Sequence, residues 1–248
     1  MSKMADSEPI HISVVVPVRN EQDNIEPLLD EIDAALAELT PFEVIYVNDG
    51  STDRTGEVLD RLRQSRSHLR HLKHVVSCGQ SAAVRTGVRH ARADIVVTLD
   101  GDGQNDPAFI PQMAALLLAK GENCGLIQGQ RVGRKDTGFK KFQSKVANWV
   151  RSRILHDGTR DTGCGLKCFR RDAYLALPYF DALHRFMPAL MRREGYELGY
   201  VDVRDRPRNA GVSNYGFFDR LWVGIVDLRG VRWLISRRKK IPQVEEHR

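Results

Sequence analysis

The chain has 248 residues, the length of one large α/β domain or of a domain with a modest extension. Its 42% hydrophobic and 28% charged residues are ordinary for a globular protein, so a packed core is expected. The net charge of +6 favours an anionic partner, but nucleic acid, acidic lipid and phosphorylated substrates all satisfy it.

The first residues and the cysteines exclude two further classes. Residues 1–10 are predicted to be a disordered N-terminus, and residues 1–9 lack the apolar core of a signal peptide. No run of about 18 apolar residues predicts a membrane span. The four cysteines, of which Cys164 and Cys168 are closest in sequence, fit no disulfide framework or zinc spacing. We expect them to be buried small residues in a reduced, cytoplasmic environment.

Apolar runs alternate with helical patterns through the first half of the chain. The short β-branched runs predict strands at 12–18, 42–47, 72–76, 94–99 and 125–128. Helical apolar spacing predicts helices at 21–39, 52–63, 81–91 and 110–120, with Thr52 or Asp53 as the cap of the second. This alternation predicts a parallel sheet with right-handed crossovers and a site at the carboxyl ends of the strands.

After Arg131 the pattern changes. Residues 135–141 are basic and glycine-containing, which predicts a mobile loop, and 142–154 have helical apolar spacing. The remaining elements are a turn plus strand at 160–169, a helix at 183–193, a strand at 196–203 and an amphipathic helix at 217–235.

The predicted strand at 94–99 leads directly into Asp100-Gly-Asp-Gly-Gln104. Two carboxylates one residue apart can present oxygens to a single Mg²⁺ or Mn²⁺, and Gln104 could add a neutral oxygen. The glycines allow a tight backbone and close approach of a ligand. A solvated acidic turn is the alternative, since Asp-Gly is a common turn dipeptide.

The predicted first and second strands also end in polar residues. Asp49, in Asn48-Asp-Gly-Ser51, could accept a hydrogen bond from a base, or the motif could be a turn that caps the next helix. Glu21 could hold ribose hydroxyls, or it could be a first-turn acid favoured by the helix dipole.

In order along the chain, these motifs resemble the family 2 glycosyltransferases of the GT-A fold, and most closely the dolichol- and polyprenyl-phosphate hexosyltransferases of the dolichol-phosphate mannose synthase type. The resemblance rests on Val16-Pro-Val-Arg-Asn-Glu21, Asn48-Asp-Gly-Ser51 and Asp100-Gly-Asp-Gly-Gln104, and it continues at 78–82, 129–131, 161–167 and 208–215. It implies a mixed, mainly parallel GT-A sheet flanked by helices over residues 11–216, followed by an amphipathic helix and basic tail at 217–248.

The same resemblance implies roles for particular residues. The nucleotide sugar would be bound by Pro17, Glu21, Asp49, Ser81 and Asp100, and the Mg²⁺ or Mn²⁺ by Asp100, Asp102 and Gln104. Arg131 matches a phosphate-binding arginine, and the acceptor phosphate would meet Lys140, Ser144 and Arg208. Two positions depart from the family pattern: Lys140 replaces an arginine and loses its planar fork, and Asn214 replaces a lysine.

The predicted reaction is inverting transfer of a hexose from a GDP- or UDP-sugar to a polyprenyl phosphate. A phosphate acceptor is already anionic and needs no base, so placement and electrostatics would dominate. A hydroxyl acceptor, soluble or on a glycan, is the alternative and would need a base, for which Asp161 is the candidate. Asp161 could equally be a structural turn residue.

The C-terminal helix combines apolar residues, two of them tryptophans, with arginines, and Arg237-Arg-Lys-Lys240 follows it. Such a helix can lie in an anionic membrane surface, which predicts a cytoplasmic protein peripheral on the inner membrane face. The alternative is a helix packed on the domain with a solvated basic tail.

Other classes fit less well. A nucleotidyltransferase would need a glycine-rich basic loop after the first strand, and a dehydrogenase a Gly-x-Gly-x-x-Gly there; residues 17–21 contain neither. No nucleic-acid motif is present, so no nucleic-acid partner is expected, and the sequence does not indicate an oligomeric state. A non-catalytic sugar-nucleotide binder stays open.

Overall fold

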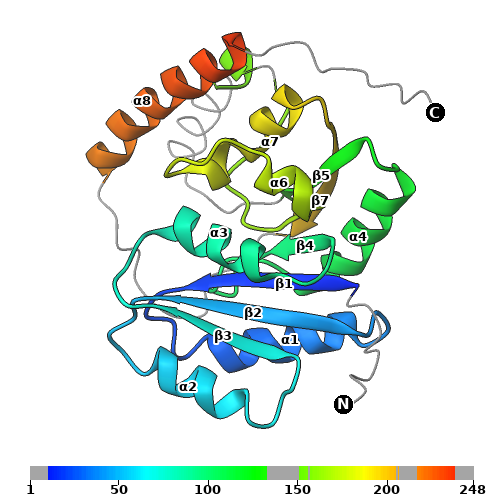
Figure 1. Cartoon of the computed structure of the whole chain (residues 1–248), viewed down its shortest axis with the longest axis vertical. Helices are drawn as coiled ribbons and strands as arrows, with labels where there is room; N and C mark the ends of the chain where they lie inside the picture. Colours follow the sequence, from blue (N-terminus) through cyan, green and yellow to red (C-terminus); the bar gives the residue numbers. More distant parts are fainter. Residues whose placement is uncertain (1–10, 133–150, 156, 205, 207–216, 238–248) are drawn as a thin grey trace, which may run out of the picture.

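The computed structural model describes residues 11–132, 151–155, 157–204, 206 and 217–237 (Figure 1). The strands of these residues form one sheet of seven, in the order β3-β2-β1-β4-β6-β5-β7. Their bounds are β1 (Ile12–Val18), β2 (Phe42–Asp49), β3 (Leu69–His74), β4 (Ile95–Thr98), β5 (Cys124–Val132), β6 (Lys167–Arg170) and β7 (Glu197–Arg204).

The sheet is mixed and mainly parallel, as predicted. β6 runs antiparallel to both of its neighbours, β4 and β5, whereas the other neighbouring pairs are parallel. The antiparallel β6 matters for the site because its first residue, Lys167, pairs with Thr98 at the end of β4. The segment before β6 therefore reaches the edge at which β1, β2 and β4 end.

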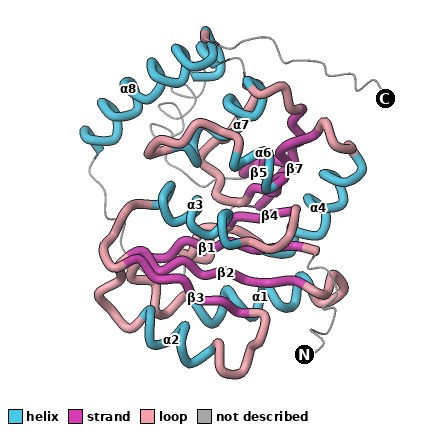
Figure 2. The backbone as a smooth tube through the Cα atoms, in the orientation of Figure 1, coloured by secondary structure: helices cyan, strands magenta, loops and turns pink. Residues whose placement is uncertain are grey.

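Helices cover both faces of the sheet (Figure 2). Their bounds are α1 (Ile25–Leu36), α2 (Thr55–Leu62), α3 (Gln80–His90), α4 (Ile110–Ala119), α6 (Arg171–Leu175), α7 (Leu183–Arg193) and α8 (Phe217–Ser236), with a short 3-10 helix η1 (Pro107–Phe109) before α4.

Side chains of β1 alternate between two apolar cores. Val14 and Val16 are buried with residues of α1, α2 and α4, whereas Val15 is buried with residues of α3, α6 and α7. Successive side chains of β1 thus face opposite sides of the sheet and are buried on both, which explains why every residue of β1 except Ser13 is apolar.

The predicted elements exist with shifted bounds. β3 covers Leu69–His74 instead of 72–76, because Val75 and Val76 are 94% and 67% exposed beyond the last residue that pairs with β2. α1 begins at Ile25 because residues 22–24 form a turn. The side chain of Asp53, a predicted cap, accepts the N–H of Thr55 at the start of α2.

Other expectations have mixed outcomes. Cys124, Cys164 and Cys168 are buried and free as expected, but the expectation of burial was wrong for Cys78, which is exposed. Residues 151–155, at the end of the helix expected at 142–154, are helical. The loop expected at 135–141, the N-terminus and the basic tail after Arg237 lie outside the described residues. Among the helices that are described, none combines the length and apolarity needed to cross a bilayer.

Candidate functional site

Three polar motifs lie at one edge of the sheet. Val18 at the end of β1 pairs with Asn48 in β2, and the N–H of Leu99 after β4 donates to the carbonyl of Val15. The hydroxyl of Thr98 donates to the carbonyl of Gly165 at 2.8 Å, which holds the segment before β6 against the end of β4. The carboxyl edge of the sheet thus gathers the motifs that were predicted to form a site.

The acidic loop after β4 is held by its own side chains. The N–H of Asp100 donates to Asn105 Oδ1 at 2.9 Å, and the N–H of Gln104 donates to Asp102 Oδ1 at 3.1 Å. Gly101 has no room for a side chain, because an added Cβ would lie 2.4 Å from Val18 Cγ1. The loop is therefore an ordered structure packed on β1 and not a solvated acidic turn.

Asp100 differs from the other acids of the site in its electrostatics. Desolvation and then the negative charge of Asp102 raise the pKa of Asp100, while Lys167 and Arg131 lower it less. Gln80 Nε2 donates to Asp100 Oδ1 at 2.8 Å. Two neighbouring carboxylates of this kind could form a donor set for a hard divalent cation.

The backbone at Gly165 closes tightly over this carboxylate. A Cβ at Gly165 would lie 2.2 Å from Asp100 Oδ2 and 2.5 Å from Oδ1. Any residue larger than glycine at this position would therefore displace the Asp100 carboxylate or the backbone that packs on it. Asp100 and Asp102, with the amide oxygen of Gln104, could hold Mg²⁺ or Mn²⁺ by their chemistry. Gln104 Nε2 donates to the carbonyl of Arg206 at 3.4 Å, so its amide oxygen is left to accept or to coordinate.

Asp49 is enclosed by hydrogen-bond donors. Its carboxylate accepts from His74 Nδ1 at 2.7 Å, Ser77 Oγ at 2.8 Å and the N–H groups of Cys78 and Gly79 at 2.8 and 2.9 Å. Burial raises the pKa of Asp49, but these hydrogen bonds outweigh it and the pKa is lowered. Asp49 thus fixes the turn that leads into α3.

Asp49, His74 and Cys78 also place three potential metal-ligand atoms within 4.8 Å of one another. Both Asp49 oxygens already accept hydrogen bonds, and His74 Nε2 lies 2.9 Å from Thr86 Oγ1. Hydrogen bonding therefore accounts for this cluster without an ion. A contact between Asp49 and a nucleoside stays a prediction.

The loops after β1 and β2 are bonded to each other. The N–H of Asn20 donates to Ser51 Oγ at 3.0 Å, and the N–H of Glu21 donates to Thr55 Oγ1 at 2.9 Å. Glu21 Oε2 accepts from Asn24 Nδ2 at 2.6 Å. Glu21 therefore lies on an ordered loop just beyond Pro17, which is the last but one of the β1 residues paired with β2, and the contact of either residue with a nucleotide stays a prediction.

Ser81 is buried and bonded to a residue that the sequence analysis did not single out. Its hydroxyl lies 2.7 Å from His184 Nδ1, which joins the start of α3 to α7. Desolvation and then the charge of Lys167 lower the pKa of His184 to about 3. The imidazole is therefore neutral at physiological pH and shares a hydrogen bond with the Ser81 hydroxyl. A role for Ser81 toward the nucleotide sugar stays a prediction.

Arg131 and Asp161 form a two-pronged ion pair. Arg131 Nε and Nη2 donate to the two Asp161 oxygens at 2.7 and 3.1 Å, and the N–H of Gly163 donates to Oδ1 at 3.0 Å. Burial raises the pKa of Asp161, but the Arg131 hydrogen bond and charge outweigh it, so the pKa is lowered. This environment makes Asp161 a weak base and favours its interpretation as a structural residue.

Lys167 is a second site residue that the analysis did not assign. Its side chain is buried, its ammonium donates to the carbonyl of Cys164, and its charge lowers the pKa of Asp100. The acceptor residues Lys140, Ser144 and Arg208, and the substituted Asn214, lie outside the described residues. Their roles stay predictions.

Solved structures with this fold include the glucosyl-3-phosphoglycerate synthase of Mycobacterium tuberculosis. Its complex with Mn²⁺, UDP and phosphoglyceric acid superposes with a TM-score of 0.66, over 93% of this chain and 80% of that chain, at 20% identity. The complex of the same enzyme with Mg²⁺ and UDP has a TM-score of 0.64, over 92% of this chain and 79% of that chain, at 21% identity. The fold is thus of the GT-A class, as predicted.

Two curated relatives are more similar in sequence. One is the dodecaprenyl-phosphate galacturonate synthase of Rhizobium johnstonii, 33% identical over 92% of this chain and 68% of its own length. Another is the undecaprenyl-phosphate 4-deoxy-4-formamido-L-arabinose transferase of Pectobacterium carotovorum, 31% identical over 84% of this chain and 63% of its own length. The model of glycosyl transferase family 2 matches residues 13–177. The chain belongs to this family, which confirms the resemblance; it spans about two thirds of the length of these relatives.

Proposed function

We propose that the chain transfers a hexose, with inversion, from a nucleoside-diphosphate sugar to a polyprenyl phosphate such as dolichyl or undecaprenyl phosphate. The observation that carries this proposal is the Asp100–Asp102 pair at the carboxyl edge of the sheet, in a chain whose curated relatives include polyprenyl-phosphate sugar transferases.

The donor side of the site would use the acidic loop. Asp100, Asp102 and Gln104 would hold Mg²⁺ or Mn²⁺, and Pro17, Glu21, Asp49 and Ser81 would bind the GDP or UDP moiety. When bound, the cation would offset negative charge on the departing nucleoside diphosphate. The Asp100 carboxylate accepts a hydrogen bond from Gln80 and the Asp102 carboxylate one from the N–H of Gln104, so both are held in place before substrate arrives, which is preorganisation.

The acceptor side would be cationic. Arg131, Lys140 and Arg208, with the hydroxyl of Ser144, would place an acceptor phosphate against the anomeric carbon. A phosphate oxygen attacks as an anion and needs no base, and the lowered pKa of Asp161 agrees with that. A hydroxyl acceptor would need a base, and the Arg131–Asp161 ion pair disfavours Asp161 for that task.

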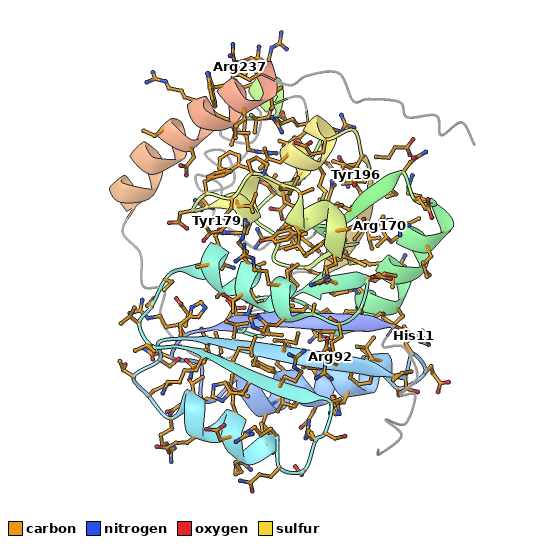
Figure 3. The ribbon with its side chains drawn as sticks, in the orientation of Figure 1. His11, Arg92, Arg170, Tyr179, Tyr196 and Arg237 are labelled. Carbon is orange, nitrogen blue, oxygen red and sulfur yellow. The ribbon has the colours of Figure 1, made fainter. Side chains whose placement is uncertain are left out.

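The C-terminal helix supports a membrane-surface location. On the face of α8 toward the domain, Val231 is buried and Leu234 packs against the core, so the packing on the domain that was given as the alternative is present. Val226 and Trp233 are 52% and 60% exposed. With the exposed Arg229 and Arg237 they form a stripe at spacings of three and four residues, and Figure 3 shows Arg237 at the end of the helix.

A stripe of tryptophan, valine and arginine is suited to the headgroup level of an anionic bilayer. We therefore place the chain peripherally at the cytoplasmic face of the inner membrane. Flotation with anionic and with neutral vesicles tests this location. Trp233→Ala should lower the fraction bound to anionic vesicles several-fold, whereas Tyr179→Ala, an exposed aromatic outside α8, should not. Equal flotation of the Trp233 variant and the wild type would refute it.

The activity is tested by incubating the chain with polyprenyl phosphate, Mn²⁺ or Mg²⁺ and a panel of labelled GDP- and UDP-sugars. We expect a butanol-extractable product that Asp102→Ala abolishes. Asp60→Ala, which removes an exposed carboxylate on α2, is the matched control and should retain activity. A labelled soluble acceptor without any extractable lipid product would overturn the polyprenyl-phosphate proposal.

A further inference from the structure

Lys167 places a buried positive charge beside the acidic loop. It is the first residue of β6, it is 3% exposed, and it pairs with Thr98, two residues before Asp100. On its other side it pairs with Gln128 of β5, which is also buried. A buried ammonium is unstable unless hydrogen-bond acceptors and a negative charge offset its loss of water. The interior of the protein must therefore supply a charge that balances Lys167.

The segment from Cys164 to Lys167 brings the ammonium and the Asp100 carboxylate to one peptide group. The ammonium donates to the carbonyl of Cys164, which belongs to the peptide group that precedes Gly165. The carboxylate lies against Gly165 itself, since a Cβ there would be 2.2 Å from Asp100 Oδ2. The Thr98 hydroxyl holds the Gly165 carbonyl at 2.8 Å, so this segment is fixed against the end of β4. The cation and the carboxylate thus have a defined relation to each other.

Asp100 is the charge that Lys167 offsets. Burial lowers the pKa of Lys167, and three nearby groups raise it: Cys164, Asp100 and Asp161. Cys164 is a neutral thiol at physiological pH, because burial raises its pKa. Asp161 already has a cation, since both of its oxygens accept hydrogen bonds from Arg131. The remaining carboxylate is that of Asp100.

We propose that Lys167 is the internal counter-charge of the Asp100–Asp102 pair and keeps the affinity of the empty site for a free divalent cation low. The inference rests on the proposed function, because it takes this pair as the cation site. A cation that arrives alone meets the like charge of Lys167 beside the two carboxylates. A nucleoside diphosphate brings negative charge, which Lys167 attracts. The cation would therefore bind firmly only together with the nucleotide.

Neutral substitutions separate this role from a structural one. Lys167→Gln keeps an amide that can donate to the Cys164 carbonyl, and Lys167→Met keeps the length of the apolar stem. Both should bind free Mn²⁺ about tenfold more tightly than the wild type, because a unit of like charge at a buried site changes a binding constant by about that factor. Neither should bind the Mn²⁺ complex of GDP or UDP more tightly. A loss of structure would instead weaken both kinds of binding.

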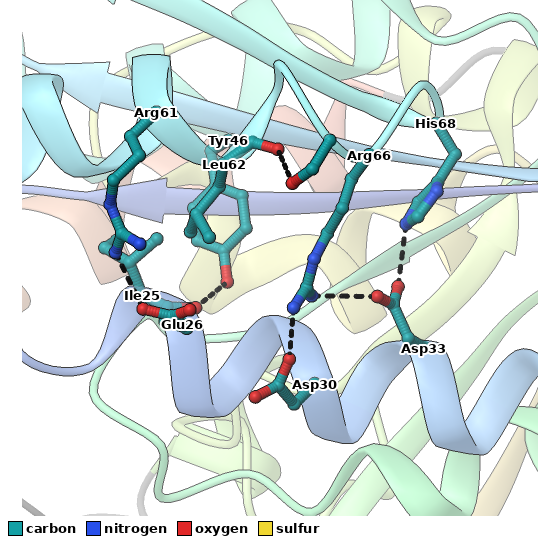
Figure 4. A network of polar contacts seen from close by, with 10 residues as sticks. Ile25, Glu26, Asp30, Asp33, Tyr46, Arg61, Leu62, Arg66 and His68 are labelled. Atoms are coloured by element: carbon teal, nitrogen blue, oxygen red, sulfur yellow. Dashed lines mark hydrogen bonds and ion pairs between the residues drawn. The ribbon is translucent and has the colours of Figure 1, made fainter.

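Free Mn²⁺ is measured by its electron paramagnetic resonance signal and nucleotide binding by calorimetry, at about pH 8, where carboxyl groups are ionised. Arg66→Met is the control, because Arg66 bridges Asp30 and Asp33 of α1 at 2.5 and 2.9 Å (Figure 4). These carboxylates are 57% and 29% exposed at their side chains, so water screens their charge. Arg66 lies shortly before β3, at the sheet edge opposite the acidic loop. The control should therefore lower Tm and leave the affinity for free Mn²⁺ unchanged.

Melting curves extend the test to variants of low stability. A ligand that binds only the folded state raises Tm by more when its Kd is lower. Mn²⁺ without nucleotide should therefore raise the Tm of Lys167→Gln and Lys167→Met by more than that of the wild type. An equal or smaller rise, or an unchanged or weaker affinity for free Mn²⁺, would overturn the inference. Variants that stay unfolded in Mn²⁺ would overturn it too, because the cation should replace the missing charge.

Failure of the proposed function looks different. Asp102→Asn should abolish the binding of Mn²⁺ seen with the wild type. If the wild type binds no Mn²⁺, or if Asp102→Asn binds it equally well, the pair is not the cation site and both proposals are wrong. If the Mn²⁺ results are as expected but no lipid-linked product forms, only the proposed acceptor is wrong, because these titrations require no sugar transfer.

Discussion

Replacing Gly165 by alanine tests whether the observed position of the Asp100 carboxylate is required for sugar transfer. The new Cβ would lie 2.2 Å from Asp100 Oδ2, whereas ordinary contact begins near 3.4 Å, so one side must retreat by about 1 Å. Gly165 is restrained by the hydrogen bond from Thr98 to its carbonyl, so we expect the carboxylate to move. A displacement of about 1 Å at a reacting centre costs about 100-fold, or about 2.7 kcal/mol of transition-state stabilisation.

The assay is the initial rate of sugar transfer, with a melting curve for each variant. Gly56→Ala is the control, since it adds the same methyl group inside α2 where the nearest atom is Asn48 Nδ2 at 3.3 Å. We expect Gly56→Ala to retain at least a third of the wild-type rate. A Gly165→Ala enzyme with a rate within threefold of wild type and an unchanged Tm would refute the reasoning.

Three other substitutions have expected outcomes. Asp161→Asn should lower the transfer rate, because Arg131 loses its ion-pair partner. The shape of the pH–rate profile should stay unchanged between about pH 6 and 9, because a carboxyl of lowered pKa stays ionised throughout that range. If the wild-type rate falls at low pH and the variant's does not, Asp161 acts as a base. Gly87→Ala puts a Cβ 2.3 Å from Val15 Cγ1 beneath α3 and should cost about 1–3 kcal/mol in urea unfolding, and an unchanged midpoint would contradict this. His184 protonates near its ordinary pKa only when unfolded, so stability should fall by up to about 2 kcal/mol as the pH drops from about 6.5 to 5. His184→Asn should lose that pH dependence, and equal slopes would contradict the buried neutral imidazole.

Local sequence pattern predicted the elements whose burial is regular. The predicted bounds of β1 and α7 agree with the structure. A strand buried on both faces is apolar along its length, and a helix buried on one face has apolar residues at helical spacing, so both patterns can be recognised in the sequence. β3 was misplaced since Val75 and Val76 look like strand residues, yet the pairing with β2 ends at His74. The five-residue α6 was missed because so short a helix has no period to detect.

The acids of the site were predictable, but their partners were not. Asp100 and Asp102 follow a buried strand directly, so their location at the sheet edge comes from chain order alone. His184 lies 103 residues from Ser81, and Arg206 lies 175 residues from Glu31, so no local spacing indicates either contact. Such partners are determined by how the helices pack on the sheet, which a single sequence does not express as a pattern.

Differences among the acids of the site bear on which of them can hold a cation. The carboxylates of Asp49 and Asp161 are stabilised as anions by surrounding donors, four hydrogen bonds in one case and an arginine fork in the other, and both pKa values are lowered. Asp100 differs because burial and the charge of Asp102 raise its pKa, despite the nearby Lys167. A cation placed beside Asp49 or Asp161 would compete with donors already in place, whereas one placed at Asp100 and Asp102 would relieve an existing repulsion. We therefore expect a divalent ion to bind at the Asp100–Asp102 pair in preference to Asp49 or Asp161.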